Sequence, residues 1–140
     1  MKFRKPQTKK GWEKYCHDLW SYAVRLRDKF ICQYSHKKYN ADSRGLHPHH
    51  IITKGSARGL RFDLDNGISL SCYYHRNVAH NQDIRQIGVF KEWIIDKKGQ
   101  EWYDELVYRA GQYRKVDLEE TAKILEDVIT ELEGGGLCQE

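Results

Sequence analysis

The sequence has no long hydrophobic run, only two prolines and a single methionine among its 140 residues. No apolar stretch approaches the roughly 18 residues that a membrane-spanning helix needs. The N-terminal segment MKFRKPQTKKGW is basic and lacks the apolar stretch of a secretion signal. These absences argue against collagenous, proline-rich and membrane-embedded chains, and we expect a cytoplasmic protein.

Paired cysteines are absent as well. The four cysteines contain no CxxC pair, and without a secretion signal we expect reduced thiols rather than a disulfide framework. They are Cys16, Cys32, Cys72 and Cys138. Hydrophobic residues make up 39% of the chain and charged residues 31%. This composition and length predict one folded domain over residues 1–140.

Charge and histidine are unevenly distributed. Residues 1–98 carry 20 Lys/Arg and 9 Asp/Glu, a net charge of +11, whereas residues 99–140 carry 4 and 11, a net charge of −7. Six of the seven histidines lie between His36 and His80. A basic body attracts polyanions without regard to sequence. Because the basic excess and the histidines share one stretch, nucleic acid is favoured over small molecules as a partner.

Hydrophobic periodicity predicts helices at both ends of the chain and short strands between them. We expect an N-terminal helix over 11–29, strands within 46–52 and 67–72, and a helix that starts after Tyr74. A helical part over 83–133 follows, with stripes from Ile84 and Ile87 to Ile94, from Trp102 to Ala110, and from 118 to 132. Asp117 is the expected N-cap of the last helix and the three glycines at 134–136 its end. The fold class is therefore α+β, a strand–loop–strand–helix unit within a mainly α-helical single domain.

The segment LHPHHIITKGSARGLRFDLDNGISLSCYYHRNVAH, residues 46–80, carries the candidate chemistry. His49 and His50 point to opposite faces if they end a strand, so one can face a metal and the other a water molecule or substrate. The strand–loop–strand–helix unit brings one of them together with Asn66 and His75. Neutral imidazoles there would form an incomplete coordination sphere with positions left for water and phosphate.

This segment resembles the HNH endonuclease motif, the ββα-metal finger. The similarity lies in HHII for the first histidine element, Asn66 in DNGISL for the asparagine, and His75 nine residues later for the last histidine. RFDLDNG also resembles a phage-encoded, recombination-type subgroup with a helical tail. The resemblance implies a small ββα-metal finger, and an HNH endonuclease that hydrolyses the phosphodiester bonds of duplex or branched DNA in phage DNA processing or recombination.

The resemblance also implies residue roles. His49 and His75 would bind one divalent metal ion, which could be Mg²⁺, Mn²⁺, Ni²⁺ or Zn²⁺. His50 would be the general base that activates water, and Asn66 would orient the motif loop and the base. Arg58 and Arg61 precede the asparagine and are candidates to bind phosphate, with ordinary surface charge as the alternative.

The sequence departs from the family pattern at the structural zinc that many relatives hold with two CxxC pairs. The first pair here reads CQYS at 32–35, and the second would fall at Ser71 and Tyr74. Cys72 lies one residue out of register. We therefore expect no structural zinc held by four cysteines. Aromatic packing is expected in its place, by Tyr34, Tyr73 or Tyr74.

The third metal ligand is the other departure. Relatives often carry it four residues after the last motif histidine, which here is Ala79, and the nearest histidine is His80. Five residues of an ideal helix turn through about 140° from the starting direction. His80 can therefore bind the metal only if the helix ends or distorts near 78–79. His17, His36 and His47 have no partner in the motif and are expected to be structural or solvated, with His47 the best placed of them to approach substrate.

Two other functions remain open. The displaced His80 and the missing zinc cysteines favour a non-catalytic nucleic-acid-binding module that retains the HNH fold, whereas the complete set of His49, His50, Asn66 and His75 favours the enzyme. The acidic last helix could bind a protein partner or a second copy of the chain. That interpretation makes the chain a structural or adaptor protein, and it leaves the histidines unexplained.

Overall fold

A long amphipathic helix, α1 (Lys9–Arg27), begins the folded part of the chain. The computed structural model describes residues 4–53, 55–83, 85–86, 88–112 and 114–138, with the backbone alone for 135–138. Thr8 is the N-cap, because its Oγ1 accepts a hydrogen bond from the amide of Gly11 at 3.1 Å. The helix ends before Lys29 and Phe30, whose φ angles are positive. The prediction of a helix over 11–29 is confirmed, and each predicted bound lies two residues after the observed one.

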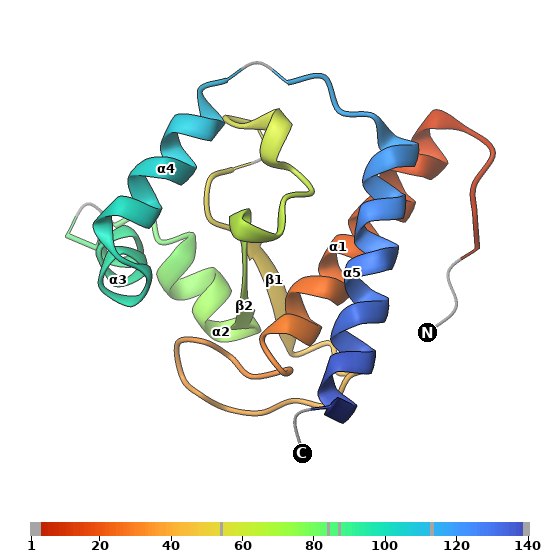
Figure 1. Cartoon of the computed structure of the whole chain (residues 1–140). Helices are drawn as coiled ribbons and strands as arrows, with labels where there is room; N and C mark the ends of the chain where they lie inside the picture. The colour runs from red at the N-terminus through yellow and green to blue at the C-terminus, as the bar shows by residue number, and fades with distance from the viewer. Residues whose placement is uncertain (1–3, 54, 84, 87, 113, 139–140) are drawn as a thin grey trace.

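The strands and the short helices that follow them form the unit predicted by the sequence. Strands β1 (Leu46–His50) and β2 (Gly67–Ser71) pair antiparallel, with His49 opposite Ile68 and His50 opposite Gly67. The loop between them contains the 3₁₀ turns η1 (Arg58–Leu60) and η2 (Leu64–Asn66). Strand β2 leads directly into a short helix, α2 (Cys72–Tyr74), and a π-helical turn, η3 (His75–Ala79). Figure 1 shows the two strands between α1 on one side and the helices α3 (Val89–Lys98) and α4 (Gln100–Ala110) on the other.

The C-terminal half is helical but differs from the predicted bounds. Helices α3 (Val89–Lys98), α4 (Gln100–Ala110) and α5 (Leu118–Cys138) follow one another. The prediction that the first of them starts at Ile84 was wrong, because Gly88 has a φ of +92°, which no α-helix accommodates. Ile84 and Ile87 themselves lie outside the described residues.

The last helix starts as predicted and ends later. Asp117 Oδ1 accepts a hydrogen bond from the amide of Glu120 at 3.1 Å, as the capping pattern indicates. The prediction that the glycines at 134–136 end the helix was wrong, because α5 continues through them to Cys138. Glycine weakens a helix interior without forbidding it. In the part of the chain that the structure describes, no helix combines the length and the apolar character needed to cross a membrane.

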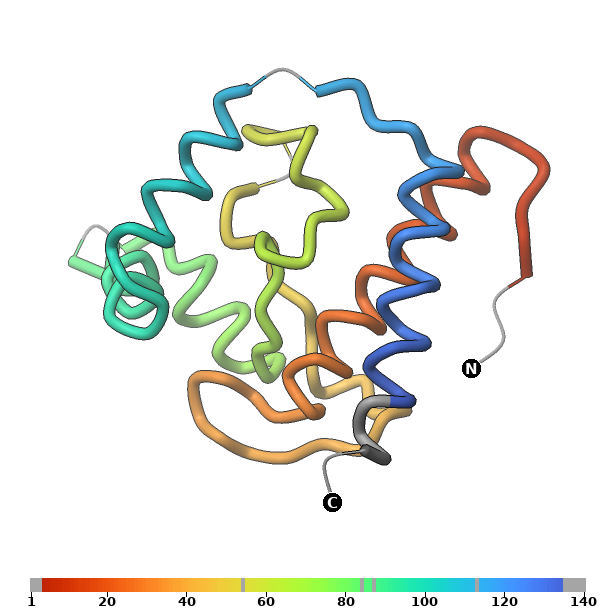
Figure 2. Tube along the Cα trace, viewed as in Figure 1, coloured from red at the N-terminus to blue at the C-terminus, as the bar shows by residue number. Residues whose placement is uncertain are grey.

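One hydrophobic cluster joins the two ends of the chain. Helices α1 and α5 lie side by side (Figure 2), and the apolar stripe of α5 is buried against α1. The buried residues of the cluster include Leu19, Trp20, Val24, Ala122, Leu125 and Ile129. This confirms that the stripes of α1 and α5 form core, whereas Val107 of the predicted stripe at 102–110 is 44% exposed. A partner or a second copy of the chain would therefore meet the acidic outer face of α5.

A second cluster packs the strands against the middle helices. Leu46, Ile68 and Leu70 of the strands and Ile94 of α3 are buried together with Cys32. Helix α1 covers the strands closely at Gly67, where an added Cβ would lie 2.5 Å from a methyl group of Val24. The chain is thus a mainly helical α+β domain, as predicted.

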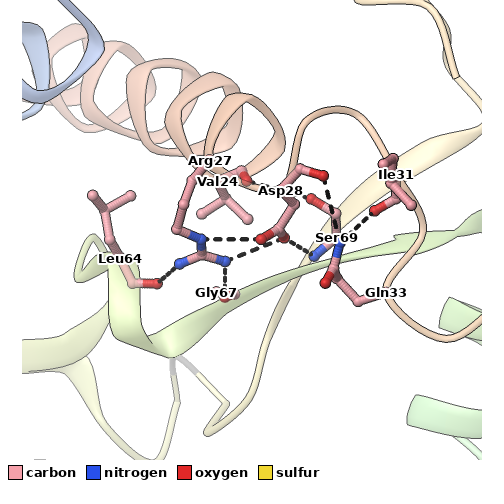
Figure 3. A network of polar contacts seen from close by, with 8 residues as sticks. All are labelled: Val24, Arg27, Asp28, Ile31, Gln33, Leu64, Gly67 and Ser69. Carbon is pink, nitrogen blue, oxygen red and sulfur yellow. Dashed lines mark hydrogen bonds and ion pairs between the residues drawn. The ribbon is translucent and has the colours of Figure 1, made fainter. Parts of the chain in front are cut away.

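Polar contacts tie the end of α1 to the strands (Figure 3). The guanidinium of Arg27 donates to the carbonyl oxygens of Leu64 at 2.6 Å and Gly67 at 2.7 Å. Asp28 pairs with this guanidinium and accepts the amide of Ser69 at 2.8 Å. These bonds fix the register between α1 and β2, and so the position of the residues that β1 presents.

Candidate metal centre

Three histidine side chains converge beside the end of β1. His49 comes from β1, His75 begins the π turn and His80 caps it. One ring nitrogen of each lies within 4.8 Å of the others, close enough to hold a metal ion. The Nε2 atoms of His75 and His80 are 3.1 Å apart. Among the described residues, no other group of three or more His, Cys, Asp or Glu side chains meets this condition.

The π turn explains how His80 reaches the other two rings. In an α-helix, residues five apart face directions about 140° apart. A π turn closes hydrogen bonds between residues five apart, so it brings such residues close to the same face. The turn covers His75–Ala79, the place where the sequence requires a distortion. His80 therefore reaches the other two rings although it lies five residues after His75.

Burial keeps two of these rings neutral. His49 is 5% exposed and packs edge-on against the ring of Phe90 at 4.9 Å. Burial, with smaller contributions from His75 and His80, lowers the pKa of His49 to about 3. Burial, with contributions from His80 and His47, lowers the pKa of His75 to about 4. Both rings therefore offer lone pairs at neutral pH, which is the form that binds metals.

His50 lies on the other side of β1, facing α1. Its ring stacks on the indole of Trp20, with centroids 4.1 Å apart and planes 11° apart. Its Nε2 lies 2.8 Å from the carbonyl oxygen of Arg61. A carbonyl oxygen only accepts, so Nε2 carries the hydrogen and, in the neutral ring, the lone pair is on Nδ1. The adjacent histidines thus have separate surroundings, as the alternation of a strand predicts.

Asn66 is fully buried and holds both parts of the loop that joins the strands. Its Oδ1 accepts the amide of Ile52 at 2.8 Å, and its Nδ2 donates to the carbonyl oxygens of Ile52 at 2.9 Å and Leu60 at 3.3 Å. Leu60 immediately precedes Arg61, whose carbonyl oxygen bonds His50. Asn66 therefore holds the loop that orients His50, the role that the resemblance implies for it.

The two arginines of this loop share a cleft of about 480 Å³. Arg58 is exposed, whereas Arg61 is half-buried over the ring of Phe62 and lies 3.9 Å from the carboxylate of Glu13. The Nε atom of Arg61 is buried and has no hydrogen-bond partner among the described residues. The cleft also includes Lys9, which the sequence pattern did not single out. Three cations against one carboxylate make it suited to an anion.

The positions at which the sequence resemblance would place zinc cysteines are packed together. The buried Sγ of Cys32 accepts the amides of Ser35 at 3.4 Å and Ser71 at 3.2 Å. The ring of Tyr74 lies 4.7 Å from that of Tyr34, which also contacts Trp93. Tyr73 is 65% exposed and adds little to this packing. Of the three tyrosines named from the sequence, two fill this region.

His47, expected to be structural or solvated, contacts one of the three converging histidines. The Nδ1 of His47 lies 3.1 Å from the Nδ1 of His75. The alternation of side chains in β1 was the signal, because residues 47 and 49 share a face. His17, also expected to be structural or solvated, has its ring 6.4 Å from that of His50. His36 is exposed and is not one of the three converging histidines.

Comparisons of the chain with protein-family models, with curated proteins and with solved structures found no match. The chemistry of the site therefore depends on three features of its own residues. These are the three converging imidazoles, a fourth imidazole on the opposite face of the strand, and a cationic cleft beside the loop that orients it.

Proposed function

We propose that the protein is a metal-dependent endonuclease of the HNH class, a phosphodiester hydrolase that cleaves DNA. The observation that carries this proposal is the convergence of His49, His75 and His80 in a ββα unit, with His50 next to the first of them in the chain. The likeness to phage recombination nucleases in RFDLDNG supports a role in phage DNA processing.

The residues fit a single divalent cation. Two nitrogen ligands about 2.0–2.1 Å from one ion lie roughly 2.9–3.4 Å apart at angles near 90–109°. The 3.1 Å between the Nε2 atoms of His75 and His80 falls in this range, and the ligand atoms of all three histidines lie within 4.8 Å of one another. Imidazole ligands suit Ni²⁺ and Zn²⁺, and the open positions also accommodate Mg²⁺ and Mn²⁺. A bound cation would stabilise negative charge on the phosphate and on the leaving 3′ oxygen.

The other residues supply proton transfer and substrate binding. The Nδ1 of His50 would accept the proton of the attacking water, while its Nε2 stays bonded to the carbonyl oxygen of Arg61. Asn66 would maintain this orientation through the loop. Lys9, Arg58 and Arg61 would bind a phosphate of the DNA backbone in their cleft.

The alternative function, a non-catalytic binding module, loses support. The displaced His80 favoured it, and the π turn brings His80 back to the other two rings. The missing zinc cysteines favoured it as well, and the packing of Tyr34 on Tyr74 accounts for that region without thiolates. Three converging histidines are a feature that DNA binding alone does not need.

A plasmid-nicking assay tests the proposal. Supercoiled DNA is incubated with the protein and Mg²⁺, Mn²⁺, Ni²⁺ or Zn²⁺, with and without excess chelator. We expect nicking that depends on metal. His49→Ala and His75→Ala should lose both nicking and metal binding, and calorimetry measures the latter. The matched control is His36→Asn, because His36 is exposed and outside the site. If the protein binds DNA but nicks it with none of the four metals, the result would support the non-catalytic binding module instead.

A further inference from the structure

We propose that His47 is a positioning residue that fixes the tautomer of His75, so that the Nε2 of His75 faces the metal position. This inference rests on the metal site of the proposed function. It concerns a histidine that is outside the converging three and has no place in the HNH pattern. The contacts of its two ring nitrogens carry the proposal.

The chain of hydrogen bonds begins at a backbone carbonyl. The Nε2 of His47 lies 3.0 Å from the carbonyl oxygen of Arg44. Because a carbonyl oxygen only accepts, this nitrogen carries the hydrogen. In the neutral ring the Nδ1 of His47 is then an acceptor.

The next hydrogen bond determines which ring nitrogen of His75 carries the hydrogen. The Nδ1 of His47 lies 3.1 Å from the Nδ1 of His75, and an acceptor on one side requires a donor on the other. His75 therefore carries its hydrogen on Nδ1, and its lone pair is on Nε2. That Nε2 is the atom 3.1 Å from the Nε2 of His80.

The backbone holds His47 in place for this role. His47 and His49 lie on the same face of β1, and Pro48 separates them. The ring of proline restricts φ, so the two histidines have little freedom to move relative to each other. His47 pairs with Leu70, which is fully buried in the core, and this pairing keeps the strand in register.

The opposite tautomer would be unable to bind metal at this position. With the hydrogen on Nε2, His75 would present an N–H group to the cation, and the ring would have to turn to offer Nδ1. Residues that orient a metal-binding histidine in this way typically contribute about 10- to 100-fold to metal affinity. His47 can orient His75 in this way because it contacts the Nδ1 of His75.

The variants separate the effect of the ring nitrogens of His47 from the effect of its size. His47→Phe keeps a ring of similar size and removes both nitrogens. His47→Asn places an amide oxygen where Nδ1 was, so it retains an acceptor for His75. His36→Asn is the control, since His36 is exposed and contacts none of the converging histidines. Circular dichroism and thermal unfolding establish that each variant is folded.

Two measurements test the proposal. Long-range ¹H–¹⁵N correlation spectra of the metal-free protein report the tautomer of His75, and calorimetry with Zn²⁺ reports affinity. We expect the Nδ1–H tautomer in the parent and in His47→Asn, and a mixture of tautomers in folded His47→Phe. Zinc affinity should fall about 10- to 100-fold in His47→Phe, with recovery in His47→Asn.

The outcomes distinguish this inference from the proposed function. An unchanged His75 tautomer and unchanged zinc affinity in folded His47→Phe would overturn the role of His47 and leave the metal site standing. If the parent protein binds no metal at all, the proposed function fails. The spectra of the metal-free variants then still decide whether His47 sets the tautomer of His75.

Discussion

The helical pair of α1 and α5 and the ββα unit are built by different interactions. Apolar stripes join the two helices, and Ala122 and Leu125 are almost fully buried at their contact. The ββα unit depends on directional bonds, such as those of Asn66 to its loop and of Arg27 to β2. Hydrophobic burial is large but not directional, whereas hydrogen bonds have defined lengths and angles. The helical pair is therefore suited to stabilise the domain, and the ββα unit to position side chains.

Helix α1 connects the two regions. On one side it packs against α5, and on another Trp20 stacks on His50 and donates its indole N–H to the carbonyl oxygen of Asp63 at 2.9 Å. Variants in each region can therefore show whether the stability of the domain and the chemistry of the site are separable. The following predictions test this separation, from the largest expected effect to the smallest.

The largest effect is expected for His50→Ala. Loss of a general base lowers cleavage by about 10²- to 10⁴-fold. Zinc affinity should be unchanged, because the lone pairs that bind metal belong to His49, His75 and His80. Nicking rates and calorimetry on the same preparation measure both quantities. Cleavage by His50→Ala at the parental rate would show that His50 is not the base.

In the helical pair, Leu125→Ala should destabilise the domain without changing the site. Leu125 is 2% exposed, and truncation of a buried leucine costs about 2–5 kcal/mol in unfolding free energy. Ile124→Ala is the matched control, since Ile124 is 56% exposed and its loss should change stability by less than about 0.5 kcal/mol. Urea unfolding gives the free energies. A loss of zinc affinity in folded Leu125→Ala would mean that the two regions are coupled.

Asn66→Ala should affect stability and cleavage together. The variant leaves the buried amide and carbonyl of Ile52 without the bonds that Asn66 provides, at about 1–3 kcal/mol for an unsatisfied group. Cleavage should fall less than in His50→Ala, because Asn66 orients the base and accepts no proton. The control is Asn77→Ala, an exposed asparagine on the π turn. Parental stability in Asn66→Ala would contradict its role in holding the loop.

Over a single pH unit, the smallest effect is a pH dependence that originates in the ββα unit. The pKa of His49 is lowered from 6.5 to about 3 by burial, so below pH 6.5 the unfolded chain binds a proton that the folded state does not. Stability of the metal-free protein should therefore decrease as the pH falls from 6.5 towards 3, by up to about 1.4 kcal/mol per pH unit from His49. The more exposed His75, whose pKa is lowered to about 4, should add less. Urea unfolding at several pH values measures this slope, and it should flatten in His49→Phe. An equal slope in parent and His49→Phe would exclude His49 as its source.

Features that depend on near neighbours in the chain were predictable. The stripe of α1 placed that helix within two residues of its bounds, and the capping pattern at Asp117 placed the start of α5. The opposite orientation of His49 and His50 follows from the alternation of any strand. The start of α3 was missed, because a hydrophobic stripe does not reveal that Gly88 adopts a left-handed φ.

The sequence by itself determined the order of the elements, the stripes that become core and the histidines that β1 presents to each side, because these follow from local periodicity. Only the tertiary structure decided that a π turn brings His80 to His49 and His75, and that His47 meets His75. It also decided that the Arg61 carbonyl and the Trp20 ring orient His50. These contacts join residues up to 31 positions apart, and they depend on the register of β1 against β2 and of α1 against both strands. Periodicity carries no information about that register.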